Sequence, residues 1–574
     1  MSTLMNGARI MLECLVREGV DCFFGYPGGV VLPLYDAVYD HPIRHILVRH
    51  EQNAVFAASG YARSSGRVGV CSATSGPGAT NLITGLVDAM MDSIPVVAFT
   101  GQVHSKLIGT DAFQEADTFG ITRACTKHNY LVKSVTELPQ IIHEAFYLAA
   151  SGRPGPVLID IPKDVFMGQT HYGPVSSIHL PGYRVFTEGH TGQIRRAAQM
   201  IAESERPLVY AGGGIIAADA APELRALVEL ADLPTVCTLM GLGGLPGTHP
   251  NFISMLGMHG GYAANMAISE CDLIIAVGVR FDDRVTGRLS AFAPHAKVIH
   301  IDIDPAEIGK IRTPDLPIVG DAKRILNKVT SVLRDLDTSE HPAAARKAWW
   351  HRIRDWKEEH PLTPSISADE IKPQHVMAEV DRISHGEAII TTDVGQHQMW
   401  AAQFIRFNTP RRWLTSGGLG SMGFSLPAAM GAQMANPDSL VIALVGDGGF
   451  QMSLPELSTI ASNGLPLKMV IVNNGYLGMV RQWQELFFNN RRSAVELECF
   501  PDAEKLGAAY GIPGRTIERP EDLRPALELA VREPGPYLLN VKVSSFENVY
   551  PMVPPGAALN EMVLAPPQPV AMPK

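Results

Sequence analysis

Short runs of apolar residues alternate with helix-length amphipathic stretches along most of the chain. The runs are rich in Val, Ile and Leu, and they end in Gly, Ser, Asp or another turn or cap residue. This alternation is typical of parallel β-sheets whose strands are connected by helices. We therefore predict an α/β fold with three doubly wound parallel sheets. In such sheets, ligands bind at the carboxyl ends of the strands.

The apolar runs gather in three segments, which predict three domains. These are residues 1–170, 190–336 and 372–545, and a Pro-rich, irregular tail follows at 546–574. A charged, Trp-rich stretch at about 337–370 predicts a solvated helix in an interdomain connection. The predicted strands lie within 22–29, 45–51, 66–74, 94–102 and 154–164, then 207–215, 271–284 and 296–310, and finally 386–400, 439–449, 465–474 and 535–543.

Composition narrows the class of protein. The chain has 574 residues, of which 46% are hydrophobic and 18% charged, an ordinary globular mixture. Its net charge of −10 argues against nucleic acid or an anionic membrane as the main partner. No apolar run is long enough to span a membrane, and the first residues predict an amphipathic helix, not a secretion signal. Seven cysteines without a Cys-x-x-Cys pair fit a reducing cytoplasm.

The most informative local motif lies in the third segment. Gly446-Asp447-Gly448 ends one buried strand, and Asn473-Asn474 ends the next. A helix-length stretch separates them, so both motifs should lie at the same edge of a parallel sheet. The two motifs could be an ordinary turn and an ordinary strand end. At average composition, however, the pair at this spacing should arise in fewer than about one chain in a hundred.

The residue types suit a magnesium ion that shares its ligands with a diphosphate. Mg²⁺ prefers oxygen ligands in octahedral geometry. Asp447 offers a carboxylate oxygen, Asn474 an amide oxygen and Tyr476 a backbone carbonyl. Gly448 and Gly449 would let backbone N–H groups approach phosphate oxygens at a helix N-terminus. The motif therefore predicts a metal–diphosphate site.

The Gly-Asp-Gly and Asn-Asn pair resembles the thiamine diphosphate motif. Further stretches look like the catalytic subunit of the acetohydroxyacid synthase family, in order and over about residues 5 to 560. They are FGYPGG (24–29), RHEQ (49–52), TSGPGATN (74–81), GTDAFQE (109–115), KHNYLV (127–132), SGRPGPVLIDIPKD (151–164), LGMHG (256–260), GVRFDDRVTG (278–287), TTDVGQHQMW (391–400), SGGLGSMGF (416–424) and LGMVRQWQ (477–484).

The resemblance implies thiamine diphosphate, Mg²⁺ and FAD as cofactors. It also changes the interpretation of Glu51, which by itself would be a favourable charge at a helix N-terminus. In the family, a glutamate bonds the aminopyrimidine ring and favours its imino form. The catalytic residues that the resemblance implies are Glu51, Phe113, Gln114, Lys163, Met422 and Trp483.

Other positions match cofactor contacts of the family. Those for thiamine diphosphate are Pro77, Asn81, Val394, Gly395, Gln396, His397, Gly420, Met422, Gly446, Asp447, Gly448, Gly449 and Asn474. Those for FAD are Arg123, Gly212, Gly213, Gly214, Met258, His259, Gly260, Arg284, Asp302, Ile303 and Asp321. Plainer roles stay open: a core methionine for Met422, a buried aromatic for Trp483, a surface lysine for Lys163, and an ion pair with Asp282 or Asp283 for Arg284.

The implied reaction joins two 2-ketoacids. Pyruvate loses CO₂, and the remaining two-carbon unit is transferred to a second pyruvate or to 2-ketobutyrate, giving 2-acetolactate or 2-aceto-2-hydroxybutyrate for branched-chain amino acid biosynthesis. The position of Trp483 is the one that favours 2-ketobutyrate. The resemblance also implies a homodimer or a dimer of dimers, in which different subunits hold the two ends of thiamine diphosphate, and a small regulatory subunit.

Two alternatives stay open at this point. One is another reaction on the same scaffold: a decarboxylase, a pyruvate oxidase or a different carboligase. A decarboxylase commonly has adjacent histidines, and no His-His pair occurs here. The other is a non-catalytic protein that only binds a nucleotide, but both Glu51 and Asp447 are present.

Gly449 departs from the family pattern, because serine is commoner after Gly-Asp-Gly.

Overall fold

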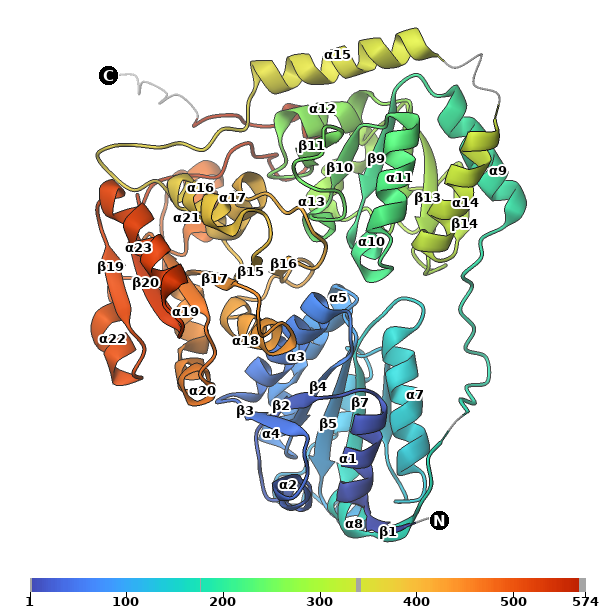
Figure 1. The fold of residues 1–574 in the computed structure, drawn as a ribbon, viewed down its shortest axis with the longest axis vertical. Helices are drawn as coiled ribbons and strands as arrows, with labels where there is room; N and C mark the ends of the chain where they lie inside the picture. The colour runs from blue at the N-terminus through green and yellow to red at the C-terminus, as the bar shows by residue number, and fades with distance from the viewer. Residues whose placement is uncertain (1–2, 176, 337–341, 567–574) are drawn as a thin grey trace.

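The computed structural model describes residues 3–175, 177–336 and 342–566. Within these residues the chain forms three six-stranded parallel sheets and one two-stranded antiparallel sheet (Figure 1). Helices flank the parallel sheets, so the predicted α/β fold with three doubly wound parallel sheets is confirmed. Residues 337–341 of the predicted connection and residues 567–574 of the predicted tail lie outside the described residues.

The first sheet has the strand order β3-β2-β4-β5-β7-β6. Its strands are β2 (Cys22–Gly25), β3 (Arg44–Leu47), β4 (Gly69–Ala73), β5 (Val96–Gln102), β6 (His128–Leu131) and β7 (Val157–Pro162). The separate pair is β1 (Thr3–Asn6) with β8 (Gln169–Tyr172). The helices are α1 (Gly7–Arg17), α2 (Leu32–Tyr39), α3 (Glu51–Ser65), α4 (Pro77–Asn81), α5 (Ile83–Met91), α6 (Thr118–Thr122), α7 (Leu138–Ala150) and α8 (Lys163–Met167).

The middle sheet has the order β11-β10-β9-β12-β13-β14, which is the strand order of dinucleotide-binding α/β folds. Its strands are β9 (Pro207–Ala211), β10 (Thr235–Cys237), β11 (Phe252–Met255), β12 (Leu273–Val277), β13 (Lys297–Asp302) and β14 (Leu316–Val319). The helices are α9 (Thr191–Glu203), α10 (Gly213–Ala217), α11 (Ala221–Ala231), α12 (Tyr262–Glu270), α13 (Asp283–Thr286) and α14 (Ala322–Asp335).

The connection after the middle sheet contains α15 (Ala343–Glu359), which lies along one end of the molecule (Figure 1). The prediction of a helix there is correct, but the helix is solvated on one side only. Trp349, Ile353 and Trp356 are buried and pack into the core around the middle sheet. The tryptophans of this charged stretch therefore attach the helix to the middle sheet.

The third sheet has the order β16-β15-β17-β18-β20-β19, the same arrangement as the first. Its strands are β15 (Ile389–Thr392), β16 (Trp413–Thr415), β17 (Val441–Gly446), β18 (Lys468–Asn473), β19 (Gly514–Ile517) and β20 (Tyr537–Lys542). The helices are α16 (Pro373–Ser384), α17 (Gln396–Phe404), α18 (Ser425–Ala435), α19 (Asp447–Ser453), α20 (Leu457–Asn463), α21 (Gly478–Phe487), α22 (Ala503–Ala509) and α23 (Pro520–Arg532).

Each sheet has a point in its interior where the chain reverses the direction in which it adds strands. It lies between β2 and β4 in the first sheet, between β9 and β12 in the middle sheet, and between β15 and β17 in the third. The crevice at such a point is where open α/β sheets bind ligands. The glycine-rich turns at residues 212–214, 393–396 and 446–449 all follow strands that border a reversal point.

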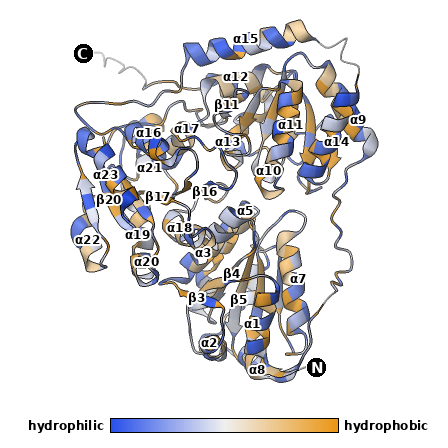
Figure 2. Cartoon of the chain, viewed as in Figure 1, coloured by the Kyte–Doolittle hydropathy of each residue, from blue (hydrophilic) through white to orange (hydrophobic). Residues whose placement is uncertain are grey.

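The strands in the interior of each sheet are apolar on both faces because helices cover both sides. All residues of β4, β5, β9 and β12 are buried. Figure 2 shows this distribution, with hydrophobic strands inside and hydrophilic helix faces outside. Among the described residues, no helix is both long and apolar enough to cross a membrane.

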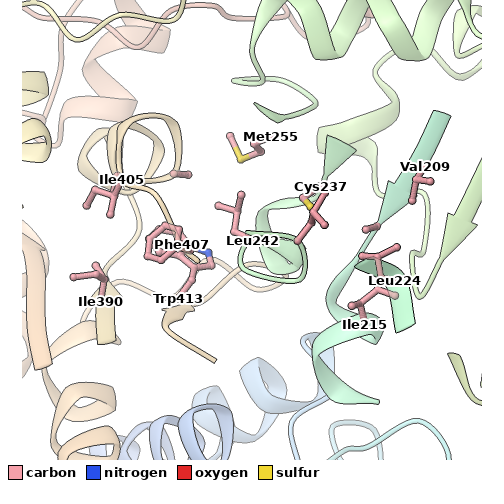
Figure 3. Close-up of a cluster of buried hydrophobic side chains, with 14 of the residues drawn as sticks. Val209, Ile215, Leu224, Cys237, Leu242, Met255, Ile390, Ile405, Phe407 and Trp413 are labelled. Atoms are coloured by element: carbon pink, nitrogen blue, oxygen red, sulfur yellow. The ribbon is translucent and has the colours of Figure 1, made fainter. Parts of the chain in front are cut away.

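The three sheets share their cores. One buried cluster combines Leu242 and Met255 near the middle sheet with Phe407 and Trp413 of the third (Figure 3). The first and third sheets meet through α3 and α18, whose backbones approach so closely that a Cβ at Gly431 would collide with the carbonyl of Ala57. The chain therefore positions its three sheets by packed interfaces.

Candidate active site

The structure brings together the two halves of the predicted metal–diphosphate motif. Strands β17 and β18 are neighbours, so Asp447 and Asn474 emerge at the same sheet edge. The Asp447 carboxylate accepts the N–H of Gly448 (3.1 Å) and the N–H of Gly475 (2.9 Å). Burial raises the pKa of Asp447 to about 6. These backbone donors hold the carboxylate in place beside the Asn-Asn turn.

The donor set fits a hard divalent cation. Asp447 supplies a carboxylate, Asn474 an amide oxygen and Tyr476 a carbonyl, which are the oxygen types that Mg²⁺ takes in proteins. No group of three or more His, Cys, Asp or Glu side chains suited to a metal occurs in the described part of the chain. A cation held here therefore needs further oxygens from a ligand or from water, as in sites where Mg²⁺ is shared with a diphosphate.

The neighbouring turn at the end of β15 faces this motif. Gln396 accepts a hydrogen bond from Asn474 Nδ2 (3.2 Å) and donates to Gln482 Oε1 (2.8 Å). The ring of His397 is buried and lies 3.1–3.2 Å from the place where a Cβ at Gly446 would stand. Burial lowers the pKa of His397 to about 4, so the ring is neutral at pH 7. Its Nε2 has no hydrogen-bond partner within the described residues, and in the tautomer that carries its proton there it would donate to a phosphate oxygen.

The surroundings of residue 449 explain why glycine stands here, where serine is commoner in the family. A Cβ at this position would collide with Oδ2 of Asp393, the buried aspartate at the end of β15. The other Asp393 oxygen accepts the N–H of Ser425 (2.8 Å), and burial raises the pKa of Asp393 to about 7. In this chain, a side chain at 449 would have to displace that carboxyl.

The loop with Gly420 and Met422 reaches the same place from β16. The Met422 methyl carbon lies 3.3 Å from the Cβ position of Gly448, so the methionine packs over the predicted diphosphate turn. Asp92, at the end of α5, fixes the start of this loop by accepting the N–H groups of Gly417 (3.0 Å) and Gly418 (2.7 Å). Arg63 donates to Asp92 at 2.8 Å. Sequence reasoning did not identify Asp92 or Arg63, although charged residues within apolar helices were a usable signal.

Glu51 begins α3, immediately after the edge strand β3. Its Oε2 accepts a hydrogen bond from Asn81 Nδ2 (2.9 Å). The Cβ position of Gly78, in the turn that Pro77 begins, lies 3.4 Å from Glu51 Oε1. Nearby, the Thr74 and Ser75 hydroxyls are buried without a partner among the described residues. The structure therefore brings the residues predicted for the pyrimidine end into one group, with unused polar atoms beside it.

The other predicted catalytic residues of the first segment are Gln114, Phe113 and Lys163, and the structure places Gln114 beside the turn that precedes Pro77. Gln114 has a positive φ of 59°, and its carbonyl oxygen lies 2.7 Å from the Cβ position of Gly76. Phe113 is 88% exposed, which is unusual for so large an apolar side chain. Lys163 begins α8 after β7 and is half-buried.

A large pocket of about 1740 Å³ lies where the three domains meet, with Met91, Asp92 and Arg153 of the first domain in its lining. It exceeds the roughly 300–1,000 Å³ of a usual small-molecule site, so it has room for a large ligand. The guanidinium of Arg284 lies over the ring of Trp483 inside it, 6.0 Å from the ring centroid. The predicted residues that line this pocket are Gly212, Gly213, Gly214, Met258, His259, Arg284, Asp302, Ile303, Asp321, Val394, Gly395, Gly420 and Trp483.

Several predicted residues lie outside this pocket. Arg123 is exposed at the end of α6, and Gly260 lies beneath the wall of the pocket, where its N–H donates to Gly257. Glu51 and its neighbours are also absent from the pocket lining. So are Met422 and the predicted metal–diphosphate residues, which are Gln396, His397, Gly446, Asp447, Gly448, Gly449, Asn474 and Tyr476. Arg284 does form the alternative ion pair with Asp283 (3.2 Å), but on the surface, where such a pair contributes little.

These sheets and sites define a class of protein. Three family models match successive parts of the chain: the N-terminal TPP (thiamine pyrophosphate) binding domain of thiamine pyrophosphate enzymes at residues 5–121, their central domain at 194–329, and their C-terminal TPP binding domain at 393–541. The chain therefore belongs to the thiamine pyrophosphate enzymes.

Curated relatives narrow this class. The chain is 49% identical to "Acetolactate synthase isozyme 2 large subunit" of Escherichia coli, over 97% of this chain and 99% of the relative. It is 50% identical to "Acetolactate synthase" of Mycobacterium bovis, over 98% and 92%, and 47% identical to "Acetolactate synthase 3, chloroplastic" of Brassica napus, over 97% and 86%. The chain belongs to the acetolactate synthase family, also called acetohydroxyacid synthase, and within it resembles the large subunits.

Proposed function

We propose that this protein is the catalytic subunit of an acetolactate synthase, which joins pyruvate to a second 2-ketoacid in the first common step of branched-chain amino acid biosynthesis. The observation that carries the proposal is the near full-length relationship to acetolactate synthase large subunits. The pocket supports it, because Arg284 and Trp483 stand in one cavity with the turns of the middle and third sheets.

Each domain has a separate task in this proposal. Residues 1–170 hold the pyrimidine of thiamine diphosphate, residues 190–336 hold FAD, and residues 372–545 hold the diphosphate and Mg²⁺. Thiamine diphosphate, when bound, supplies a carbon nucleophile and an electron sink for loss of CO₂. Glu51 would exchange a proton with a pyrimidine ring nitrogen, and Asn81, which donates to Glu51 Oε2, would orient its carboxylate. Asp447, Asn474 and the Tyr476 carbonyl would hold Mg²⁺, while the N–H groups of Gly448 and Gly449 and the His397 ring would bind phosphate oxygens.

The substrate side lies in the large pocket. Arg284 pairs with the carboxylate of a ketoacid, and Trp483 packs against its alkyl group. One extra methyl in such a pocket is worth about 1–3 kcal/mol, which is enough to favour 2-ketobutyrate as the second substrate. Phe113, Gln114 and Lys163 approach the same reacting groups from the first domain, and Met422 packs between them and the diphosphate turn.

The complete site is assembled from two copies of the chain. Phe113 is 88% exposed in the single chain, and the surface of a partner would cover it. A homodimer, or a dimer of such dimers, would bring the first domain of one copy to the third domain of the other. A small regulatory subunit is a further partner, because relatives are named large subunits.

Product analysis tests the proposal. Purified protein, with and without thiamine diphosphate, Mg²⁺ and FAD, receives pyruvate alone and then pyruvate with 2-ketobutyrate. We expect acetohydroxy acids only when thiamine diphosphate and Mg²⁺ are present, with 2-aceto-2-hydroxybutyrate dominant in the mixture. Acetaldehyde, or acetate formed with oxygen uptake, would replace this function by a decarboxylase or an oxidase on the same fold.

A further inference from the structure

Glu456 of the third domain holds the turn on which Glu51 stands. It ends the short 3₁₀ helix η4 (Leu454–Glu456), which continues directly from α19, and its side chain is fully buried. Its Oε1 accepts the backbone N–H of Arg49 (2.8 Å) and the Nδ2–H of Asn53 (2.9 Å). Arg49 precedes Glu51 by two residues and Asn53 follows it by two. One carboxylate oxygen therefore bridges both sides of Glu51.

The second Glu456 oxygen is anchored within its own domain. Oε2 accepts the hydroxyl hydrogen of Thr459 at 2.6 Å, and Thr459 Oγ1 also lies 3.1 Å from the Leu47 carbonyl oxygen. In the described structure no cationic side chain pairs with Glu456. The Arg49 guanidinium instead bonds the Leu47 carbonyl and Ser458 Oγ. Glu456 is therefore a buried carboxylate held by three neutral donors.

Burying the Glu456 carboxylate costs free energy, which its three hydrogen bonds offset only when they have good geometry. A buried carboxylate requires every available donor, and removing it leaves the donors themselves unpaired. Here the unpaired donors would be the Arg49 N–H and the Asn53 amide, at the two ends of the turn that sets the direction of Glu51. A buried carboxylate is not needed merely to attach the first domain to the third. The nearby hydrogen bond from Arg49 to Ser458 Oγ (2.9 Å) already joins the two domains.

We propose that Glu456 is a positioning residue, which fixes the orientation of Glu51 toward the pyrimidine by bonding both sides of its turn. The inference rests on the proposed function, in which Glu51 exchanges a proton with the cofactor. The continuous segment formed by α19 and η4 then has a predicted metal ligand, Asp447, at its start and the residue that positions Glu51, Glu456, at its end.

The test compares four variants with the native protein. Glu456→Ala removes all three acceptor contacts. Glu456→Gln keeps them, because its Oε1 can accept from Arg49 and Asn53 while its Nε2 donates to Thr459, whose hydroxyl then turns to the Leu47 carbonyl. Ser458→Ala is the matched control, since it removes a hydrogen bond from the same interface without touching Glu456. Asn53→Ala removes one contact only and serves if Glu456→Ala does not fold.

Two readouts separate positioning from simple attachment. The first is amide hydrogen exchange of the Arg49 peptide in protein without cofactors. The second is the rate at which bound thiamine diphosphate exchanges its C2 proton with deuterium, measured by quenched NMR. We expect Glu456→Ala to accelerate exchange at Arg49 and to slow C2 exchange about ten- to hundredfold. Asn53→Ala shifts both readouts the same way by less, and Glu456→Gln and Ser458→Ala stay near the native values.

Other results overturn the inference. If Glu456→Ala accelerates exchange at Arg49 but leaves C2 exchange unchanged, Glu456 only attaches the two domains. If Ser458→Ala slows C2 exchange equally, any loosening of this interface has the same effect and Glu456 has no special role. A further variant, Glu51→Gln, distinguishes failure of the proposed function from failure of the inference about Glu456. If that variant exchanges the C2 proton at the native rate, the role of Glu51 itself is wrong, whatever the Arg49 amide shows.

Discussion

The guanidinium of Arg284 lies over the indole ring of Trp483, with 6.0 Å between Cζ and the ring centroid. The two residues come from different sheets: Arg284 is in α13 beside the middle sheet, and Trp483 is in α21 after β18. A cation over an indole face is favourable by about 0.5–1 kcal/mol at an exposed site. The ketoacid side of the pocket therefore depends on the contact between the middle and third domains.

Replacement of Trp483 by Leu should change the choice of second substrate. Loss of the flat ring removes the surface that packs against the extra methyl of 2-ketobutyrate, which is worth about 1–3 kcal/mol. In competition between pyruvate and 2-ketobutyrate, we expect the product ratio to move toward 2-acetolactate by about ten- to hundredfold. Trp483→Phe keeps a flat ring and should fall between. An unchanged ratio in Trp483→Leu would remove Trp483 from substrate selection.

Asp92 should control the loop that holds Gly420 and Met422. Asp92→Ala leaves the N–H groups of Gly417 and Gly418 without their acceptor and removes one of the two carboxylates that pair with the buried Arg63 guanidinium. The other, Asp88 (3.2 Å), remains. Since a buried hydrogen bond to a charged group contributes about 1.5–3 kcal/mol, we expect a clear fall in melting temperature and weaker thiamine diphosphate binding, measured by calorimetry.

The control for Asp92 is an exposed ion pair. Glu518 pairs with Lys542 at 2.6 Å, with both side chains more than half exposed, so Glu518→Ala should leave the melting temperature nearly unchanged. A loss of stability in Asp92→Ala without any loss of cofactor affinity would show that Asp92 supports the fold and not the loop geometry.

The sequence predicted the inner strands well and the outer ones poorly. Strands β5, β9, β12, β17 and β18 are apolar on both faces and stood out as continuous hydrophobic runs. The strands that we did not predict are β1, β6, β8, β10, β11, β14, β16 and β19, which have three or four residues each and lie at or next to sheet edges or in the separate pair. Short edge strands carry few apolar residues, so the pattern gives no distinct signal for them.

Some residues of the candidate site were predictable from the sequence and others were not. Asp447 and Asn474 were predictable because a compact motif carries both, and their sheet neighbours bring them together. Asp92 and Glu456 were not, since each accepts from backbone N–H groups hundreds of positions away. Arg63 was not predictable either, since it acts on the loop only through Asp92. Such contacts depend on the packing of α3 against α18, which no local pattern in one segment encodes.

Asp160 should make stability depend on pH. It is fully buried on β7, where Thr100 Oγ1 (2.7 Å) and Gln102 Nε2 (3.0 Å) donate to it. Burial raises its pKa from 3.8 to about 7, and the charge of Asp117 adds to this. Because the folded state binds this proton more tightly than the unfolded state, the stability it provides is present below about pH 4 and is lost as the pH rises toward 7.

Asp160→Asn removes this titration and preserves the contacts, since its oxygen can accept from Gln102 and its amide can donate to Thr100. Relative to the variant, the native protein should lose up to about 4 kcal/mol of unfolding free energy between pH 4 and pH 7. Chemical denaturation of both proteins across this range gives the difference, in which other titrating groups cancel. A difference that does not vary with pH would mean that Asp160 is ionised throughout.

The close approach of α3 and α18 should tolerate no added carbon at Gly431. A Cβ there would overlap the Ala57 carbonyl and come within 2.7 Å of the Tyr61 nitrogen, both of which are backbone atoms and cannot turn aside. Gly431→Ala should therefore force the helices apart and destabilise the protein by about 1–3 kcal/mol or more, despite the higher helix propensity of alanine. Gly535→Ala is the matched control, because nothing lies within 4 Å of its Cβ position. Thermal unfolding should separate the two variants clearly. Equal melting temperatures would show that α3 and α18 can move apart without loss of stability. The conclusion that this contact fixes the first domain against the third would then be wrong.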